Sequence, residues 1–192
     1  MKLILFNKPF NVMSQFSAHP KHPSLADFLS IPNIYPAGRL DADSEGLMLL
    51  TDHGGLQNEI SHPKRKQLKS YLVQVEGLIS ATQLEQLKHP INLGDFTTQE
   101  SIATEIAEPD WLWPRNPPVR QRLSIPTSWL SLSISEGKNR QVRRMTAAVG
   151  LPTLRLIRHE IAGFSLFTHP IFPGEYLDVS SEISQHFPHL QK

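Results

Sequence analysis

The chain has 192 residues, of which 39% are hydrophobic, and it contains no cysteine. This length and composition fit a folded domain with a hydrophobic core, and they exclude intrinsic disorder, disulfide bonds and thiolate metal sites. The N-terminal apolar run is too short for a signal peptide, and no stretch approaches the roughly 20 apolar residues of a membrane span. We therefore expect a soluble, cytoplasmic protein that does not bind membranes.

The formal net charge of +1 conceals an uneven distribution of charged residues. Residues 71–110 carry one basic and seven acidic side chains, whereas residues 111–159 carry nine basic side chains and one acidic side chain. Because phosphate binding is largely Coulombic, the basic half predicts a surface that binds a polyanion. A solvated surface that pairs with the acidic stretch would explain the same distribution, and charge alone does not separate these two hypotheses.

The first part of the chain alternates short strands with short helices. We expect strands at 2–6 and 10–16, a short helix within 22–30 that Ser24 caps, a buried strand at 46–51, one or two helical turns at 54–61, and a strand at 69–77. Apolar and polar residues alternate in the last of these strands, which places Tyr71, Val73 and Val75 on one face.

The second part contains more strands than helices. We expect a helix at 80–89 that Ser80 caps, and strands within 99–107, 128–135, 153–166 and 174–179. Residues 109–126 contain five prolines and cannot be regular, but their two tryptophans and three arginines predict an exposed, partly docked loop. Strands that follow one another directly favour an α+β fold, with a mostly antiparallel mixed β-sheet flanked by helices.

The segment 139–150 predicts a helix with two chemically distinct faces. It should begin near Asn139 and end at Gly150, a typical C-terminal cap. At about 100° per residue, three arginines share one face and three apolar residues share the other. The arginines are Arg140, Arg143 and Arg144, and the apolar residues are Val142, Met145 and Val149. Basic charge in the first turn opposes the helix dipole, which indicates anion binding at this end; an ordinary surface helix is the alternative.

Carboxylates in the segment 38–54 partly match a calcium-binding loop. The residues at positions 1, 3, 5, 6 and 12 of such a loop would be Asp41, Asp43, Glu45, Gly46 and Asp52. The match then fails, because the residue at position 9 is Leu49, which has no side-chain oxygen, and because no helix pattern precedes the segment. A calcium-regulated module is therefore a weak hypothesis, and we expect no metal site.

The same segment, GRLDADSEGLMLLTDHG, resembles the signature G-R-L-D-x-x-[ST]-x-G-L-L-L-L-T-x-D-G of pseudouridine synthases, in the branch that modifies ribosomal RNA. Four more blocks resemble that family and appear in its order: FNKPFNVMSQF, KSYLVQVEG, EGKNRQVRRM and GLPTLRLIRHEIAGFSL. The resemblance covers nearly the whole chain and is strongest to the large-subunit group. It implies the pseudouridine synthase catalytic fold in a single domain, 1–192, without an N-terminal accessory RNA-binding domain.

The chain departs from the family pattern at several positions but keeps the aspartate of the signature. Phe10 and Asn11 replace a glycine-bearing turn, Ser44 stands where threonine is common, His53 alters the end of the signature, and Arg140 replaces a frequent histidine. These positions affect the expected shape of the substrate pocket.

The resemblance implies that a uridine in large-subunit ribosomal RNA is converted to pseudouridine without a metal or a cofactor. Asp41 is the implied nucleophile, Arg143 is the implied arginine partner from the third block, and Tyr71 matches the active-site tyrosine. Alternation along its strand would also make Tyr71 an ordinary core aromatic. Asp43 and Glu45 are expected to form the turn or to pair with nearby bases rather than to catalyse.

RNA binding must repay the free energy of extracting the target base, a few kcal/mol. The expected phosphate contacts are Arg39, Lys138, Arg140 and Arg144. We expect RNA as the partner, not DNA or a membrane, and a monomeric protein. The competing hypothesis is a non-catalytic RNA-binding factor that assists ribosome assembly, which would explain the basic residues but not the signature around Asp41.

Overall fold

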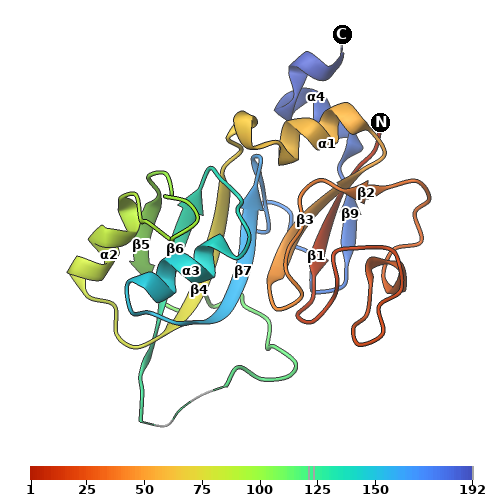
Figure 1. The fold of residues 1–192 in the computed structure, drawn as a ribbon. Helices are drawn as coiled ribbons and strands as arrows, with labels where there is room; N and C mark the ends of the chain where they lie inside the picture. Colours follow the sequence, from red (N-terminus) through yellow and green to blue (C-terminus); the bar gives the residue numbers. More distant parts are fainter. Residues whose placement is uncertain (121, 123, 192) are drawn as a thin grey trace. The chain divides into compact units, whose positions relative to one another are not determined.

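The computed structural model describes residues 1–120, 122 and 124–191 (Figure 1). The chain divides into two compact units, and the second is inserted in the sequence of the first. Unit 1 comprises Met1–Gln67 and His159–Lys192, and unit 2 comprises Leu68–Arg158.

Three antiparallel strands form the centre of unit 1. Strand β1 (Leu3–Lys8) pairs on one side with β3 (Glu45–Thr51) and on the other with β9 (Tyr176–Asp178). Every residue of β1 and β3 is buried, as expected for their continuous apolar runs, so both faces of these strands are covered. The short strand β2 (Tyr35–Pro36) extends the pairing beyond β3.

Short helices follow the strands of unit 1. Helix α1 (Gly54–Ser61) and the 3₁₀ turn Pro63–Arg65 follow β3, while the 3₁₀ turn Ser180–Glu182, helix α4 (Ile183–His186) and the turn Pro188–Gln191 follow β9. The predicted helix within 22–30 is a single 3₁₀ turn, Leu25–Asp27, in which Ser24 and Asp27 form a capping box.

The strand expected at 10–16 is wrong, because this segment forms a tight turn. Asn11 has φ 69°, a left-handed conformation that asparagine tolerates better than most residues. Its backbone N–H donates to the carbonyl oxygen of Ala42 at 2.7 Å rather than to a neighbouring strand. The turn therefore joins the loop that carries Asp41.

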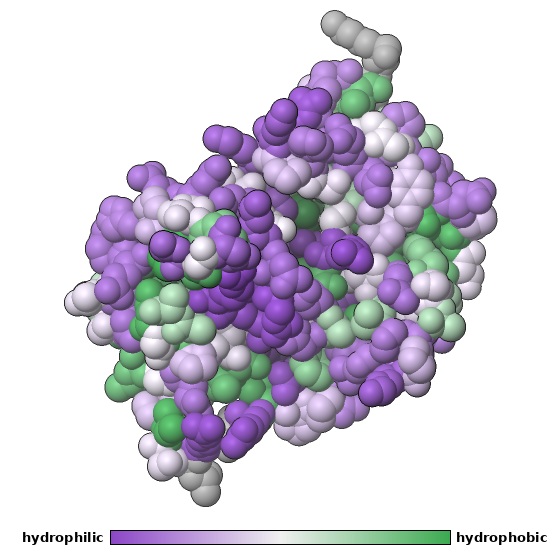
Figure 2. Space-filling model, in the orientation of Figure 1, coloured by the Kyte–Doolittle hydropathy of each residue, from purple (hydrophilic) through white to green (hydrophobic). Residues whose placement is uncertain are grey.

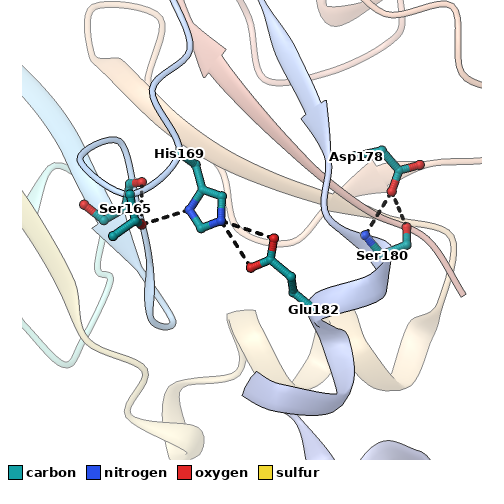
Figure 3. A network of polar contacts seen from close by, with 6 residues as sticks. Ser165, His169, Asp178, Ser180 and Glu182 are labelled. Carbon is teal, nitrogen blue, oxygen red and sulfur yellow. Dashed lines mark hydrogen bonds and ion pairs between the residues drawn. The ribbon is translucent and has the colours of Figure 1, made fainter.

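Polar contacts hold the C-terminal segment of unit 1 in place (Figure 3). Nδ1 of His169 lies 2.9 Å from Thr168 Oγ1, and its Nε2 lies 3.2 Å from Glu182 Oε2. The Asp178 carboxylate accepts from both the backbone N–H and the hydroxyl of Ser180. His186 stacks on Phe164 with ring centroids 4.0 Å apart, so the C-terminal turns are packed as well as hydrogen-bonded.

Unit 2 is built on the strand order β5-β6-β4-β7. Strand β6 (Thr127–Ile134) pairs antiparallel with both β4 (Lys69–Glu76) and β5 (Ile102–Ile106). Strand β7 (Thr153–Ile161) runs back into unit 1 and turns through a hairpin into β8 (Phe164–Ser165). The predicted strands at 69–77, 99–107, 128–135, 153–166 and 174–179 are thereby confirmed.

Two helices complete unit 2, α2 (Ala81–Lys88) and α3 (Gln141–Ala148). Ser80 caps α2 as predicted, through a capping box with Gln83. A small apolar cluster of Leu72, Trp129 and Ile157 is covered by Leu112 and Trp113, from the start of the proline-rich segment 109–126. Within that segment, Gln121 and Leu123 lie outside the described residues.

The predicted α+β class, with a mostly antiparallel mixed sheet and flanking helices, is confirmed. None of the helices in the described ranges is long and apolar enough to cross a membrane.

Candidate functional site

Backbone hydrogen bonds fix the Asp41 loop on both sides of the aspartate. The Ser14 hydroxyl accepts from the Leu40 N–H at 3.1 Å and donates to the Leu40 carbonyl oxygen at 2.6 Å. On the other side, the Ala42 carbonyl accepts from the N–H of Asn11, and the Asp41 carbonyl accepts from Ser44 N–H at 3.1 Å. Asp41 is half-buried, so it lies on a loop whose backbone is fixed and which solvent and ligand can still reach.

A fully buried lysine reinforces this loop. Lys8 has 0% exposure, and its Nζ donates to three carbonyl oxygens: those of Pro9 and Val12 at 2.9 Å and of Ala42 at 3.3 Å. A buried ammonium is tolerated only when its donors are satisfied. Lys8 therefore ties the end of β1 and the turn after it to the residue that follows Asp41.

Two other carboxylates of the segment, Glu45 and Asp52, lie at opposite ends of one strand. Glu45 is 1% exposed and begins β3, whereas Asp52 follows the other end of the same strand. At about 3.3 Å per residue these two lie about 20 Å apart. The Lys2 N–H donates to Asp52 Oδ1 at 2.7 Å and holds the pKa of Asp52 below its usual value. In the part of the chain that the structure describes, no group of three or more His, Asp or Glu side chains could hold a metal ion.

Tyr71 lies in unit 2 beside a buried arginine. Its side chain is on β4 and it is 7% exposed, while Arg158 is on β7 and is 2% exposed. Burial lowers the pKa of Arg158, while the charge of Tyr71 and its hydrogen bond to the guanidinium act in the opposite direction. Tyr71 is thus a buried aromatic whose hydroxyl is hydrogen-bonded to a buried cation.

Lys69 adds a second cation to this cluster. Burial, with a contribution from the charge of Arg158, lowers the pKa of Lys69 to about 8. A Cβ placed on Gly137 would lie 3.6 Å from Lys69 Cε, so the lysine stem runs along the backbone just ahead of α3. Lys69, Tyr71 and Arg158 form a positively charged cluster that only the structure reveals.

Helix α3 has the predicted apolar face, but its arginines differ from one another. Val142 and Met145 are buried, whereas Val149 is only half-buried. Arg140 is exposed and is the N-cap in a left-handed conformation, so the helix begins two residues later than predicted. Arg143 is half-buried with its Nε inside the protein, and Arg144 is half-buried and ion-paired with Asp95. Hydrophilic residues gather over the N-terminal end of α3 in Figure 2.

The site residues expected from the sequence fall into two groups. Arg39 is exposed and shares the fixed loop of unit 1 with Asp41. In unit 2, Lys138, Arg140, Arg143 and Arg144 occur at the beginning of α3, and Tyr71 lies on β4. Within unit 2, Lys138 and Arg144 lie over the same Phe96 ring, and Tyr71 lies beside Arg158.

Lys8, Ser14 and Arg158 are functional candidates that the sequence analysis missed. A charged residue that closely follows apolar residues of a predicted strand was the available signal for Lys8, but Arg158 had no such distinction because Arg155, His159 and Glu160 share its strand. Ser14 carries no such signal, because its role depends on a loop 26 residues further along the chain.

Comparison with known proteins identifies the family of this chain. Residues 2–148 match the model of the RNA pseudouridylate synthase family, and the chain belongs to this family. It is 49% identical to ribosomal large subunit pseudouridine synthase E of Vibrio vulnificus (strain CMCP6), over 93% of this chain and 75% of the relative. It is 51% identical to the protein of the same name from Xanthomonas axonopodis pv. citri (strain 306), over 85% of this chain and 87% of the relative.

A solved structure shows the same fold. A crystal structure of a pseudouridylate synthase superposes with a TM-score of 0.77 and 28% sequence identity, over 96% of this chain and 73% of the other. The predicted pseudouridine synthase catalytic fold is therefore confirmed.

Proposed function

We propose that the protein converts a uridine of large-subunit ribosomal RNA into pseudouridine, with Asp41 as the nucleophile. The observation that carries the proposal is the fixed Asp41 loop within a signature that belongs to an RNA pseudouridylate synthase chain. The ribosomal target rests on relatives about half identical in sequence, whose names specify the large subunit.

The reaction is an isomerisation and balances without a co-reactant. The bond between N1 of uracil and C1′ of ribose breaks, the base turns, and a bond from C5 to C1′ forms. The proton on C5 is lost and N1 gains one. No electrons enter or leave, so the expected absence of a metal and a cofactor is consistent with the chemistry.

Asp41 is suited to a nucleophilic role because its position is set before the substrate arrives. A carboxylate is a weak nucleophile and must be ionised and oriented to react. The bonds to Leu40 and Ala42 fix the backbone on both sides of Asp41 without using the carboxylate. Whether Asp41 attacks the base or the sugar, a fixed backbone reduces the entropy lost in reaching the transition state.

Tyr71 and Arg143 complete the proposed catalytic set. The ring of Tyr71 can stack on the target uracil, and its hydroxyl can assist the movement of the C5 proton. The buried Arg158 guanidinium orients that hydroxyl. Arg143 is assigned to this set from its place in the third family block.

The proposed RNA contacts supply the binding energy for base extraction. Arg39 is exposed on the loop of Asp41, and Lys138 and Arg140 are exposed where α3 begins. Each would contact a phosphate, as would Arg144, and affinity should then fall steeply with salt. We further propose that the chain acts in the cytoplasm as a monomer and as a single catalytic domain, 1–192.

Tritium release tests the proposal. Large-subunit ribosomal RNA labelled at C5 of uridine is incubated with the wild type, with Asp41→Asn and with Asp43→Asn as a matched control. Release by the wild type and the control, but not by Asp41→Asn, is expected. Release by all three would remove Asp41 from its role while keeping the reaction.

Small-subunit RNA and tRNA serve as alternative substrates in the same assay. Release from one of these, and not from large-subunit RNA, would correct the target. No release from any of the three, with RNA binding intact, would support the non-catalytic assembly factor instead.

A further inference from the structure

A rigid hairpin at residues 91–98 faces the first turns of α3. The Leu93 N–H donates to the Phe96 carbonyl at 2.9 Å, and the Thr98 N–H donates to the Ile91 carbonyl at 2.9 Å. Asn92 and Thr97 form a β-bridge, and Asn92 Oδ1 accepts from the Gly94 N–H at 2.8 Å. Gly94 has φ 95°, so the tip uses the one residue that adopts this conformation without strain. We call residues 91–98 the acidic hairpin, after Asp95 at its tip.

The acidic hairpin holds Arg144 through several contacts. Arg144 Nη1 donates to Asp95 Oδ2 at 3.3 Å, and Nη2 donates to Asp95 Oδ1 and to the Leu93 carbonyl, the latter at 2.6 Å. The guanidinium carbon lies 5.0 Å from the centroid of the Phe96 ring, and Lys138 Nζ lies 5.6 Å from the same centroid. Two cations, Arg144 and Lys138, thus lie over the Phe96 ring. Arg144 is also ion-paired with Asp95.

The Asp95–Arg144 pair has the geometry with which arginine binds phosphate. Two guanidinium nitrogens face two oxygens of one anion, as in a bidentate phosphate contact. The Asp95 side chain is 67% exposed and the Arg144 side chain is 31% exposed, so water and ligands reach the pair. Exposed ion pairs contribute little net stability, so exchanging one anion for another is easy. The backbone of the acidic hairpin is fixed, so only the Asp95 side chain has to move.

We propose that Asp95 competes with RNA phosphate for Arg144, and that Phe96 and Lys138 are parts of the phosphate subsite that this exchange opens. The inference rests on the proposed function, since the competing ligand is RNA. In the free protein the Asp95 carboxylate pairs with the Arg144 guanidinium. This pairing keeps the affinity for RNA in general low. When a substrate places a phosphate at the start of α3, the phosphate displaces Asp95 and binds Arg144, with Lys138 alongside.

The test measures RNA binding rather than turnover, so its outcome is independent of catalysis. Asp95→Asn removes the charge and keeps the shape of the side chain. Affinity for a fluorescent single-stranded oligouridylate is measured by anisotropy between about 50 and 200 mM salt, where counterion release dominates. Because a generic oligouridylate leaves Asp95 paired with Arg144 in the wild type, we expect Asp95→Asn to bind it more tightly at low salt. The slope of log K against log salt should steepen by about 0.7, the value for one additional phosphate contact on a single strand.

Three further variants separate competition from a general change in charge. Asp110→Asn makes the same charge change at an exposed position outside the acidic hairpin and should leave the slope unaltered. Arg144→Ala should weaken binding, and Asp95→Asn should have no further effect in the Arg144→Ala background. Equal gains from Asp95→Asn and Asp110→Asn, a gain that persists without Arg144, or an unchanged slope in Asp95→Asn would each overturn the proposal.

Discussion

The hydroxyl of Ser14 satisfies both backbone groups of Leu40, the residue immediately before the proposed nucleophile. Replacing Ser14 with alanine leaves a buried N–H and a buried carbonyl without this partner, which costs about 1–3 kcal/mol. We expect Ser14→Ala to lower the free energy of unfolding by that order and to reduce kcat more than KM, because the loop around Asp41 loses its anchor. Urea unfolding and single-turnover tritium release measure the two effects. The exposed Ser17→Ala is the control, and equal effects from both variants would exclude an anchoring role for Ser14.

Tyr71 and Arg158 should be energetically coupled in turnover. If Arg158 acts through the Tyr71 hydroxyl, Arg158→Lys should lower kcat strongly in the wild-type background. In the Tyr71→Phe background, which lacks the hydroxyl, the same substitution should lower kcat only slightly. Contacting residues typically show interaction energies of about 0.5–3 kcal/mol in such double-mutant cycles. The measurement is kcat for both single variants and the double variant on the same RNA. Additive losses would show that Arg158 does not act through the Tyr71 hydroxyl.

His159 should make the protein less stable in mild acid. It is 8% exposed, and burial lowers its pKa to about 4, from 6.5. Neither ring nitrogen has a hydrogen-bond partner within the described residues, and Phe167 packs against the ring at 5.4 Å. Between about pH 6.5 and 4 the unfolded chain binds a proton that the folded chain does not, so stability falls as the pH falls through this window. At pH 5 this penalty is about 2 kcal/mol, and at pH 7 it is close to zero.

His159→Phe removes the titrating group and keeps an aromatic ring. Urea unfolding at pH 7 and pH 5 should show a smaller loss of stability for this variant than for the wild type. His89→Gln, at a histidine whose side chain is 64% exposed, should lose as much stability as the wild type. Identical losses in all three proteins would contradict the prediction.

A side chain at Gly163 should destabilise the protein through both an unfavourable backbone conformation and a steric contact. Comparison with a second glycine separates the two effects. Its φ of 83° is unfavourable for alanine, and an added Cβ would lie 2.9 Å from His186 Nδ1, whose ring is stacked on Phe164. Gly38 has φ 95° but nothing within 4 Å of the added Cβ. Gly38→Ala should therefore cost only the conformational energy, about 1–2 kcal/mol, and Gly163→Ala more. Thermal or urea unfolding gives the comparison, and an equal loss in both variants would show that the His186 ring moves aside freely.

Local patterns in the sequence predicted most of the elements because those elements depend on local physics. Continuous apolar runs gave β1 and β3, and serine caps marked the starts of α2 and of the 3₁₀ turn at Leu25. The error at 10–16 had a tertiary cause. The apolar pattern around Val12 satisfies the periodicity of a strand, but Lys8 and Asn11 direct the backbone toward the Asp41 loop. No window of the sequence contains that information.

The candidate site also contains some features that the local sequence predicts and others that depend on tertiary structure. Asp41 could be found because a long signature surrounds it, and the basic face of α3 because helical periodicity is regular. The pairing of Arg144 with Asp95 could not be found, since it joins residues 49 positions apart. The proximity of Tyr71 and Arg158 likewise depends on which strands are neighbours in unit 2, a property of topology rather than of composition.

The pairing of β1 with β9 has a consequence for the order in which the protein folds during synthesis. Strand β1 is among the first segments made, yet Leu5 lies opposite Leu177, so unit 1 stays incomplete until nearly the whole chain has been translated. Unit 2 is continuous from Leu68 to Arg158, so its segments are all translated before β9 completes unit 1. All residues of unit 2 are therefore translated while the flanking segment with Asp41 still lacks its last strand.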